Sequence, residues 1–478
     1  MDLPSPVSSL AKTDCTAKPP GLWRVGTLVY TGLGLAILFC WLLWGDFAWS
    51  LKERAVVPVA QLMLKRFAAS DFLVGLLVGS LPAALGMVLG PVISVKSDRH
   101  RGRWGRRIPF LLIPTPIAVL SMMGLALTPV LGAWLHEALG TYAPNRFVLN
   151  LAIFSFFWTT FEIATIIANT IFGGLINDVV PQEVIGRFFG MFRAVSLLAG
   201  ILFNYCLMGH AEEHFVAIFL GIGLLYGVGF ALMCCKVKEG SYPPPEVAAE
   251  RGVHPLLEIQ TYLRECFSNP YYVWVFVGMT FATLASGPFN SFCLFYVKSI
   301  GMDLDAYGKY IALTYVISLV LSYPMGMLAD RFHPLRMGML ATGLYSVAMI
   351  AGWCFARSVG SFAVALVLHG VLSGMFFTCT ASLGQRLFPR AKFAQFASAN
   401  GIIGALAFLV MPPLVGALLD FTGHAYRYTF VIGGVLALVG LVSLTVVYYK
   451  FMRLGGPRGY VAPEPAVKPA AGSNRLDI

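Results

Sequence analysis

The sequence predicts an all-α polytopic membrane protein whose twelve transmembrane helices form two six-helix bundles. Of its 478 residues, 58% are hydrophobic and 12% are charged, and the mean hydropathy is +0.75. A water-soluble globule of this composition would lack enough polar residues to cover its surface. The chain also contains twelve mostly apolar stretches, separated by short polar segments, and a helix needs ~20 such residues to cross a bilayer.

The apolar stretches end at charged, glycine-containing or proline-containing segments, which set the boundaries of the expected helices. In chain order the expected helices span residues 27–62, 72–95, 108–133, 147–176, 189–210, 215–236, 270–299, 306–329, 336–357, 360–386, 393–420 and 427–451. The first range is long enough to be one long or bent helix.

Basic residues gather between the second and third helices, after the sixth, between the tenth and eleventh, and in the tail. This positive-inside pattern accounts for the net charge of +11 and removes the need for a nucleic-acid partner. We expect a multi-pass protein of the bacterial inner (plasma) membrane with both termini in the cytoplasm. The first 24 residues lack the features of a signal peptide, so we expect the first helix to be retained.

The polar stretch after the sixth helix divides six helices from six, and the halves repeat each other. Asp98-Arg99 follows the second helix and Asp330-Arg331 follows the eighth. Such internal symmetry is typical of a transporter with a central site between two bundles. The expected segments are a cytoplasmic N-terminal segment (1–24), an N-terminal bundle (25–236), a cytoplasmic central loop (237–269), a C-terminal bundle (270–451) and a disordered cytoplasmic tail (452–478).

The stretch GPVISVKSDRHRGRWGRRIPF, residues 90–110, carries six basic side chains and a single acidic one, Asp98. One interpretation is a topology signal. The other is a charge cluster that holds the two halves in one orientation and releases them in the other. The second interpretation predicts a cytoplasmic gate formed by Asp98, Arg99, Arg103, Arg106, Arg107, Asp178, Arg187, Asp330 and Arg331.

The Asp-Arg loop and its repeat in the second half, at Asp330-Arg331, resemble the signature of the major facilitator superfamily. The pattern P-x-x-S-x-x-S-D-R-x-x-x-R-W-G-R-R-x-P-F, from Pro91 to Phe110, is similar to that of the glycoside/cation symporters and sucrose transporters, which usually have glycine at the position of Ser94. Trp49 and Pro58, followed by Gln61, resemble the first helix of sucrose transporters. The resemblance implies secondary active transport by a monomer.

Five polar or aromatic residues of the first helix fall at i, i+3, i+4, i+7 and i+8, and therefore share one helical face. They are Asp46, Trp49, Ser50, Glu53 and Arg54. The alternative is that the helix ends near Trp49 and the later residues form an external loop. The resemblance implies that Asp46 binds sugar hydroxyls, and Trp49 either stacks on a sugar ring or serves packing.

Glu162 and Asn169 lie seven residues apart on one face of the fourth helix. Ionisable residues within a span are functional candidates by default. Glu162 is therefore expected either to bind a proton or substrate, or to pair with a basic side chain. The family's helix-four carboxylate aligns with Asn169. Arg193 resembles the symporter arginine that lines the sugar site, and we expect it near Asp46 or Glu162, which are the expected proton-coupling residues.

In the second half, Asn290 is the residue favoured to bind a hydroxyl group of the substrate. His369 is instead expected to form a hydrogen bond with a neighbouring helix. Sodium-coupled relatives carry acids at the positions of Gly86 and Gly90, so protons are favoured over sodium. The nine cysteines lack metal-ligand spacing, and we expect no cofactor and no metal. The expected substrate-binding residues are Asp46, Trp49, Ser50, Glu53, Arg54, Asn169, Arg193 and Asn290.

Three functions are compatible with these residues. The first is import of a sugar or glycoside with protons. In the second, Lys52, Arg54 and Arg193 bind a carboxylate, so the substrate is a uronate or another organic anion, imported or exported. The third is an assembly factor or receptor without flux. An enzyme is not expected, because the sequence contains no Walker loop, metal-ligand pair or nucleophile elbow. The expected partners are a small-molecule substrate, a proton and the lipid bilayer.

Overall fold

The computed structural model describes residues 22–242, 262–389 and 392–463. Within these ranges, twelve helices are long and apolar enough to cross a membrane. The all-α, twelve-span architecture predicted from the sequence is therefore confirmed. Residues 1–21, most of the expected central loop (243–261) and the end of the expected tail (464–478) lie outside the described residues.

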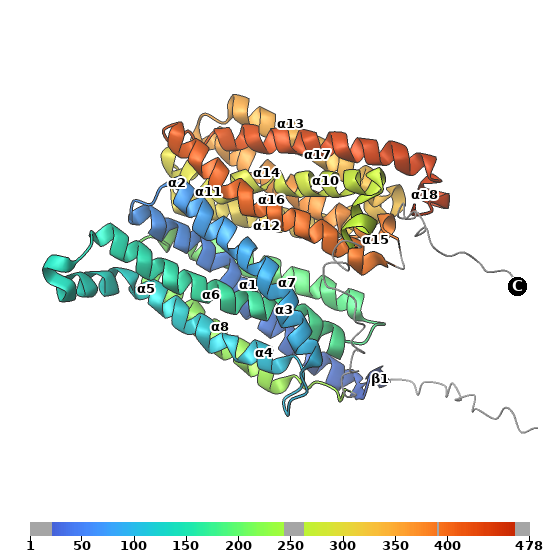
Figure 1. Ribbon diagram of the computed structural model, residues 1–478, viewed down its shortest axis with the longest axis horizontal. Coiled ribbons are helices and arrows are strands. Elements are labelled where there is room, and N and C mark those ends of the chain that lie inside the picture. The colour runs from blue at the N-terminus through green and yellow to red at the C-terminus, as the bar shows by residue number, and fades with distance from the viewer. Residues whose placement is uncertain (1–21, 243–261, 390–391, 464–478) are drawn as a thin grey trace, which may run out of the picture.

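The two halves of the chain form two bundles that lie side by side, with the blue-to-green half below the yellow-to-red half in Figure 1. The N-terminal half contains α1 (Gly32–Arg66), α2 (Asp71–Val74), the π-helical turn η1 (Gly75–Ser80), α3 (Leu81–Arg99), α4 (Ile108–Leu112), α5 (Pro114–Leu139), η2 (Gly140–Tyr142), α6 (Arg146–Val179), α7 (Ile185–Cys206), η3 (Met208–His210) and α8 (Phe215–Lys236). The elements α2, η1 and α3 run on as a single span from Asp71 to Arg99.

The C-terminal half repeats the six-span arrangement. It contains α10 (Pro270–Leu284), α11 (Gly287–Ser299), α12 (Leu304–Phe332), α13 (Pro334–Phe355), α14 (Val359–Thr380), α15 (Leu383–Leu387), α16 (Phe393–Phe421), α17 (Tyr428–Arg453) and α18 (Gly456–Gly459). The elements α10 and α11 are joined by a short break before Gly287 and Pro288, and together they form one span from Pro270 to Ser299.

The start of the first span was predicted wrongly. Strands β1 (Leu22–Val25) and β2 (Leu28–Thr31) pair as a hairpin where the helix was expected to begin. Gly26 makes the turn with a φ of 54°, a conformation that glycine adopts at little cost. Thr31 then caps α1, because its hydroxyl accepts a hydrogen bond from the backbone N–H of Gly34 at 3.1 Å. The helix continues unbroken to Arg66, so the alternative in which it ends near Trp49 is wrong.

Part of the expected disordered tail is packed instead. The Tyr460 hydroxyl donates a hydrogen bond to the carbonyl of Leu387 at 2.7 Å, and its ring lies 4.9 Å from that of Phe451. The Tyr272 hydroxyl donates to the carbonyl of Pro463 at 2.7 Å. Composition predicted disorder because proline, glycine and alanine dominate the segment, but Tyr460 and Tyr272 anchor its described part, as far as Pro463, to the bundle.

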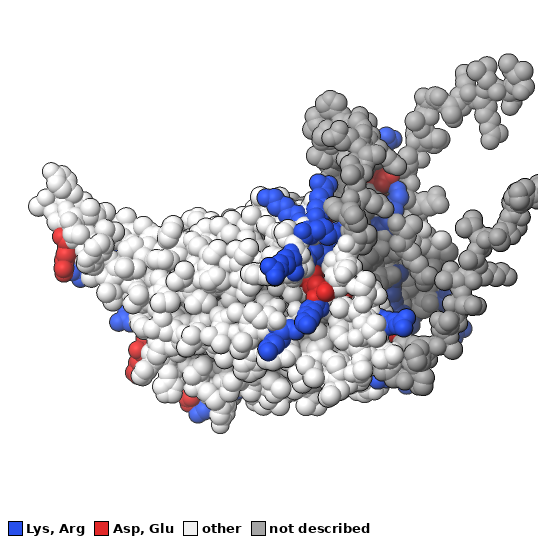
Figure 2. Space-filling view, turned by 90° about the horizontal axis from the view of Figure 1, so that it is seen from below, with Lys and Arg blue, Asp and Glu red and all other residues white. Residues whose placement is uncertain are grey.

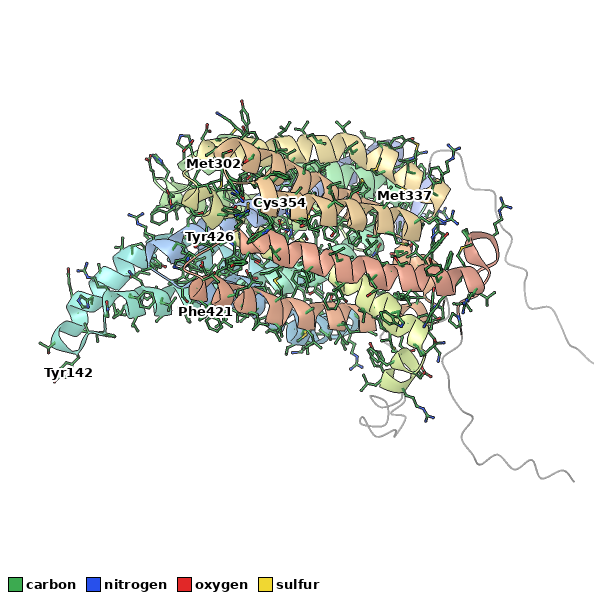
Figure 3. The ribbon with its side chains drawn as sticks, turned by 90° about the horizontal axis from the view of Figure 1, so that it is seen from above. Tyr142, Met302, Met337, Cys354, Phe421 and Tyr426 are labelled. Carbon is green, nitrogen blue, oxygen red and sulfur yellow. The ribbon has the colours of Figure 1, made fainter. Side chains whose placement is uncertain are left out.

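The two ends of the spans differ in charge. The loop of residues 100–107 and both ends of the described chain lie at one end of the molecule, which we call the basic face (Figure 1). Figure 2 shows lysine and arginine side chains gathered toward this end, whereas the surface over the helices is nearly free of charge. The opposite end carries the projecting turn at Tyr142 and the loop at Tyr426 (Figure 3).

Candidate functional site

A cavity of about 360 Å³ lies between the two halves and is lined by α1, α7, α11, α12 and α14. This volume is within the range of small-molecule sites. The lining residues are Arg54, Arg193 and Leu197 from the N-terminal half, and Phe289, Asn290, Cys293, Tyr307, Ile311, Thr314, Tyr315, Ser318, Leu366, His369, Gly370, Ser373, Gly374 and Phe377 from the C-terminal half. Both bundles therefore contribute to one site.

The N-terminal wall of the cavity is cationic. Arg54 donates a hydrogen bond from Nη1 to the hydroxyl of Tyr315, in the other half, at 3.0 Å. Arg193 lines the same cavity, and its positive charge and that of Arg54 repel each other. No aspartate or glutamate is among the described lining residues. The cavity thus presents two positive charges and no acidic group to oppose them.

A hydrogen-bonded chain supports the C-terminal wall. His369 is buried in α14, and its Nδ1 lies 2.9 Å from the hydroxyl of Tyr345 on α13. Its Nε2 lies 2.9 Å from Oδ1 of Asn290 on α11. Because the amide oxygen can only accept, Nε2 must carry the proton and Nδ1 must accept from the tyrosine. The expected bond between His369 and a neighbouring helix is present, and Asn290 is left with its NH₂ group for the cavity.

Asp46, Trp49 and Ser50 lie inside the N-terminal bundle, away from the cavity lining. Asp46 is 1% exposed. Its Oδ1 accepts a hydrogen bond from Ser50 at 3.3 Å, and its Oδ2 has no hydrogen-bond partner within the described residues. The Trp49 ring packs against Tyr226 and Phe230. In this conformation Trp49 therefore has no free face on which a sugar could stack.

Lys52 is the buried cation of the N-terminal bundle. The side chain is fully buried, its Nζ lies 3.5 Å from the centre of the Trp49 ring, and it donates to the hydroxyl of Thr165 at 3.4 Å. Its charge interacts with those of Glu53 and Glu162. Arg193 was expected near Asp46 or Glu162, but it lines the cavity and forms no ion pair with either carboxylate among the described residues. Lys52 is the cation whose charge acts on Glu162.

The sequence-predicted binding residues thus fall into two groups. Arg54, Arg193 and Asn290 share the cavity. Asp46, Trp49, Ser50, Glu53, Glu162 and Asn169 do not line it. The spacing of the residues along α1 placed them along one stretch of the helix. Spacing alone, however, does not show which side of α1 faces the C-terminal half.

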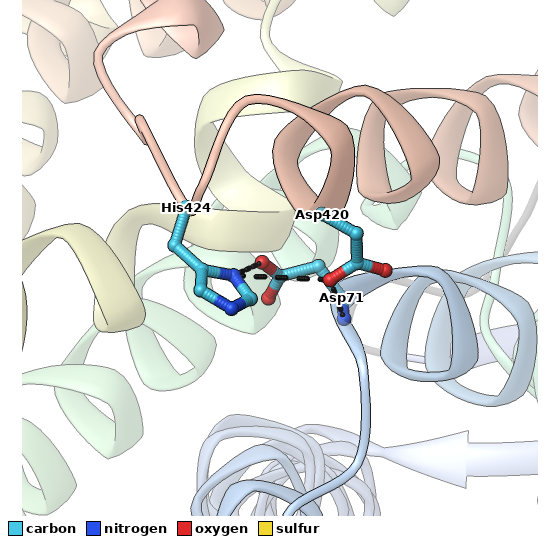
Figure 4. Close-up of side chains that lie close together, drawn as sticks. All are labelled: Asp71, Asp420 and His424. Carbon is cyan, nitrogen blue, oxygen red and sulfur yellow. Dashed lines mark hydrogen bonds and ion pairs between the residues drawn. The ribbon is translucent and has the colours of Figure 1, made fainter.

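The halves meet at the end opposite the basic face, through a buried carboxylate (Figure 4). The carboxylate of Asp71, at the start of α2, lies 2.6 Å from Lys65 Nζ and 2.6 Å from His424 Nδ1. It also accepts a hydrogen bond from the Tyr426 hydroxyl at 3.2 Å. Lys65 belongs to the N-terminal half, and His424 and Tyr426 belong to the C-terminal half. We call this end the latch face.

Asp420, at the end of α16, completes the contact by capping α2. Its two carboxylate oxygens accept hydrogen bonds from the backbone N–H groups of Asp71 and Phe72, each at 2.8 Å. Donor atoms of Asp71, Asp420 and His424 lie within 4.8 Å of one another, a spacing that a metal ion could bridge. Lys65 and the backbone amides already neutralise or occupy these oxygens, which favours a direct contact between the halves.

The latch residues were missed by sequence reasoning, which placed the second helix at 72–95 and gave Asp71, Asp420 and His424 no role. Asp71 and His424 are 353 positions apart. The only signal in the sequence was that Asp71 and Asp420 lie at ends of expected helices on the same side of the membrane. Nothing in the sequence indicates that these two helix ends contact each other.

Close backbone packing reinforces the latch face. A Cβ atom at Gly416 of α16 would meet the backbone of Asp71, and one at Gly75 would meet the backbone of Pro412. A second contact between the halves is the ion pair of Lys298 with Glu212. The molecule is therefore closed at the latch face.

We expect Gly416→Val to force α16 away from α2, because the added atoms would overlap backbone that cannot rotate aside. Spin labels at Phe421 and Tyr142, which are 89% and 91% exposed at the latch face, report the separation of the halves by pulsed electron resonance in a cysteine-free background. The distance distribution should lengthen. Gly404→Val in the same helix is the control, since a Cβ there meets nothing within 4 Å. Equal distributions for both variants would contradict the close-packing argument.

On the basic face, the ion pairs between described residues lie within each half. Asp178 at the end of α6 accepts from Arg106 Nε at 2.9 Å and from Arg107 Nε at 3.1 Å, and Arg107 also pairs with Asp98 at 2.6 Å. Burial opposes the charged form of Arg106, but the hydrogen bond to Asp178 and the negative charges of Asp178 and Asp98 together outweigh it, so the pKa of Arg106 is raised.

Two further contacts complete the basic face. Glu239 accepts hydrogen bonds from three successive backbone N–H groups at the start of α4, those of residues 106–108, at 2.7–2.9 Å. In the other half, Arg386 pairs with Asp330 at 3.0 Å. The carboxylate of Glu239 thus holds the basic loop against the end of α8.

Several expected gate partners are not joined. Arg187 was expected in the gate together with Asp178, but the ion-pair partners of Asp178 are Arg106 and Arg107. Across the described ranges, Arg99, Arg103, Arg187 and Arg331 form no ion pair, and no ion pair on the basic face joins one half to the other. Among the described residues, the ion pairs that join the halves are therefore those of the latch face, and the hydrogen bond of Arg54 to Tyr315 joins them within the cavity.

Comparison with known proteins identifies the family. Residues 65–389 match the family described as MFS/sugar transport protein. The chain belongs to this family of the major facilitator superfamily, whose members are membrane transporters of small molecules.

Similar proteins are distant from this chain. An uncharacterized MFS-type transporter, Rv1250 of Mycobacterium tuberculosis, is 29% identical over 139 residues, which are 28% of this chain and 24% of that protein. The MFS-type transporter opdF of Penicillium oxalicum is 26% identical over 128 residues, 27% of this chain and 30% of that protein. The chain therefore matches less than a third of the length of either relative.

Solved structures share the fold. A bacterial homologue of the human lysosomal transporter Spinster, in an inward-facing and unoccupied conformation, aligns with a TM-score of 0.64 and 14% identity over 87% of this chain and 98% of that one. A D-xylose-proton symporter aligns with a TM-score of 0.63 and 14% identity over 91% and 99%. At these identities the likeness supports the architecture, and substrate and coupling must be argued from the residues.

Proposed function

We propose that the protein is a secondary active transporter that imports a sugar or glycoside together with protons. The observation that carries the proposal is the polar cavity between the two halves, lined from both and lying beneath a closed latch face. A site shared by two rigid bundles can be exposed to one side and then the other as the bundles rock. Likeness in fold to a D-xylose-proton symporter is consistent with a sugar substrate.

The proposed cycle begins from the described conformation. With the basic face in the cytoplasm, as the distribution of lysine and arginine indicates, the closed latch face is external and the molecule faces inward. Opening outward would break the contacts of Asp71 with His424 and Tyr426, and would bring the two halves together at the basic face. We propose that a monomer performs this cycle, since both walls of the cavity come from one chain.

The proposed proton sites are Asp46 and Glu162. A buried carboxylate with an unpartnered oxygen, as at Asp46, is costly when charged, and binding a proton removes that cost. Glu162 can instead be balanced by Lys52. The span Asp71–Arg99 has Gly86 and Gly90 where sodium-coupled relatives carry acids, so the hard charged oxygens that sodium prefers are missing at those positions, which favours protons.

A second candidate function is transport of a uronate or another organic anion, and the cationic wall of the cavity favours it. A non-transporting assembly factor or receptor is disfavoured, because buried charges such as Lys52 are costly and a scaffold would gain little from them.

The proposal is tested with purified protein in proteoliposomes. Disaccharides, glycosides and uronates are added in turn while the external pH is recorded. We expect one class of substrate to make the medium more alkaline as protons enter the vesicles. Asp46→Asn should remove the pH response and leave substrate exchange intact. Substrate binding without any flux would support the receptor reading and contradict transport.

A further inference from the structure

A second cavity, of about 850 Å³, opens on the basic face of the N-terminal half. Its walls are the loop of residues 101–106, the helix α4, the end of α8 and the segment of residues 237–242 that follows α8. It shares no lining residue with the cavity between the two halves. It is therefore separate from the proposed transport site, and its occupant need not be the transported substrate.

The walls of this second cavity are positively charged. The basic side chains that line it are those of Arg101, Arg103, Arg106 and Lys238. Glu239 is the one acidic residue among the described residues of the lining, and its carboxylate already accepts the backbone N–H groups of residues 106–108. Arg103 and Lys238 are exposed, and neither takes part in an ion pair between described residues. These two side chains can therefore bind the oxygens of an anion.

A buried hydroxyl adds a hydrogen-bond donor beside these charges. The ring centre of Tyr242 lies 4.0 Å from the guanidinium carbon of Arg106 and 5.7 Å from that of Arg101. The Tyr242 hydroxyl is buried, and it donates to no acceptor within the described residues. A buried hydroxyl whose hydrogen has no acceptor is costly, and a phosphate oxygen would accept that hydrogen. The hydroxyl is therefore an indication, independent of the charges, that an oxyanion binds here.

Another side of the cavity is apolar and lies next to the membrane-facing surface. Leu112 of α4 and Cys235 of α8 line it. Ile113, which follows Leu112, and Leu232, one turn before Cys235, are 62% and 42% exposed. The helices α5 and α8 pack against each other and expose further apolar side chains, namely Ile117, Leu120, Leu224 and Val228. Trp104 lines the cavity and is exposed, as is typical of tryptophan at a membrane interface.

We propose that this cavity binds an anionic phospholipid of the cytoplasmic leaflet. Arg103 and Lys238 bind the phosphate of the headgroup, the Tyr242 hydroxyl donates to one of its oxygens, and the acyl chains lie along α5 and α8. The positive-inside pattern places the basic face, where lysine and arginine gather in Figure 2, at the cytoplasmic surface. Basic pockets between spans on that side suit acidic headgroups. A free phosphate ion would leave the apolar side of the cavity unused.

The test measures the retention of lipid by the full-length protein, purified in detergent, with native mass spectrometry. The probes are dioleoyl phosphatidylglycerol and dioleoyl phosphatidylcholine, which have the same acyl chains and differ in net charge. We expect phosphatidylglycerol to bind more tightly and to raise the melting temperature further. Inorganic phosphate and glycerol 1-phosphate, each at the same concentration as the lipid, should displace little of it, because they have no acyl chains.

A double variant, Arg103→Gln with Lys238→Gln, locates the site. It should weaken the binding of phosphatidylglycerol by about 10–30-fold, the loss expected when two basic side chains near a membrane surface are removed. Its binding of phosphatidylcholine should change less. The matched control is Arg331→Gln with Arg453→Gln, which removes two exposed basic side chains at the ends of α12 and α17 in the other half. The control should bind phosphatidylglycerol as the unaltered protein does.

Equal binding of the two lipids, or an equal affinity of the double variant and its control for phosphatidylglycerol, would overturn the inference. Displacement of the lipid by inorganic phosphate or glycerol 1-phosphate would also overturn it, because the site would then belong to a soluble phosphate compound. The proposed transport function stands or falls separately, since none of the four exchanged residues lines the cavity between the halves.

Discussion

Asp71→Asn is expected to open the latch face and shift the molecule toward the conformation in which the cavity faces the other side. The substitution leaves Lys65 without its carboxylate and removes the charged acceptor of His424 and Tyr426. Removing one partner of a buried ion pair costs up to ~3–5 kcal/mol. His424 is half exposed and can be solvated in compensation. We therefore expect the free-energy difference between the closed and the open latch face to change by ~1–3 kcal/mol. This corresponds to a population shift of about 5–150-fold toward the open conformation.

The separation of labels at Phe421 and Tyr142 measures this shift. The longer distance should become the major population in Asp71→Asn. Glu213→Gln is the control, because it makes the same change from carboxylate to amide on the latch face at an exposed residue that has no ion pair within the described residues. A distribution for Asp71→Asn that matched the control would show that Asp71 does not hold the halves together.

Glu162→Gln is expected to abolish accumulation of substrate against its gradient while exchange of substrate continues. Glu162 is the acidic residue of α6 whose charge balances Lys52, and a neutral amide can neither bind a proton nor balance that charge. In proteoliposomes with an imposed proton gradient, the ratio of internal to external substrate should fall to about one, the value for transport without a driving force. Glu137→Gln, at an exposed position, should leave accumulation unchanged.

The double variant Lys52→Met with Glu162→Gln separates coupling from folding. Removing both buried charges costs less stability than removing one, because Lys52 is not left buried without Glu162, and Glu53, which also interacts with Lys52, is exposed and can be hydrated. Its melting temperature should therefore exceed that of Glu162→Gln alone, and it should remain uncoupled. Restored accumulation in the double variant, or normal accumulation in Glu162→Gln, would contradict a coupling role for Glu162.

Much of the fold follows from local sequence. The twelve spans were predictable because each apolar stretch must be helical within a bilayer to satisfy its backbone hydrogen bonds. The hairpin before Gly32 was missed, since Leu28–Thr31 is apolar enough to extend the helix and the glycine turn at Gly26 gives a weak signal. The order of residues 454–463 depends on tertiary contacts of Tyr460, which composition does not reveal.

The candidate site was predictable only in part. The sequence identified Arg54, Arg193 and Asn290 as polar residues within spans, and the structure brings them to one cavity. It could not show that α1 is rotated so that Lys52, rather than Arg193, faces Glu162. The latch depends on helix ends about 350 residues apart, and the rotation and approach of helices are set by side-chain packing across the whole bundle.

In the proposed transport cycle, the latch face must open every time a substrate enters from outside. A pair of cysteines at Gly79 and Pro412 tests it, because a Cβ at Gly79 lies 2.6 Å from that of Pro412 in the other half. This is slightly closer than the ~3.5–4.5 Å of a disulfide, so a small shift allows the bond. The measurement is accumulation in proteoliposomes of a cysteine-free background carrying this pair, with each single cysteine as control. The account predicts that oxidation stops accumulation in the pair alone and that reduction restores it; undiminished accumulation with the cross-link complete would contradict it.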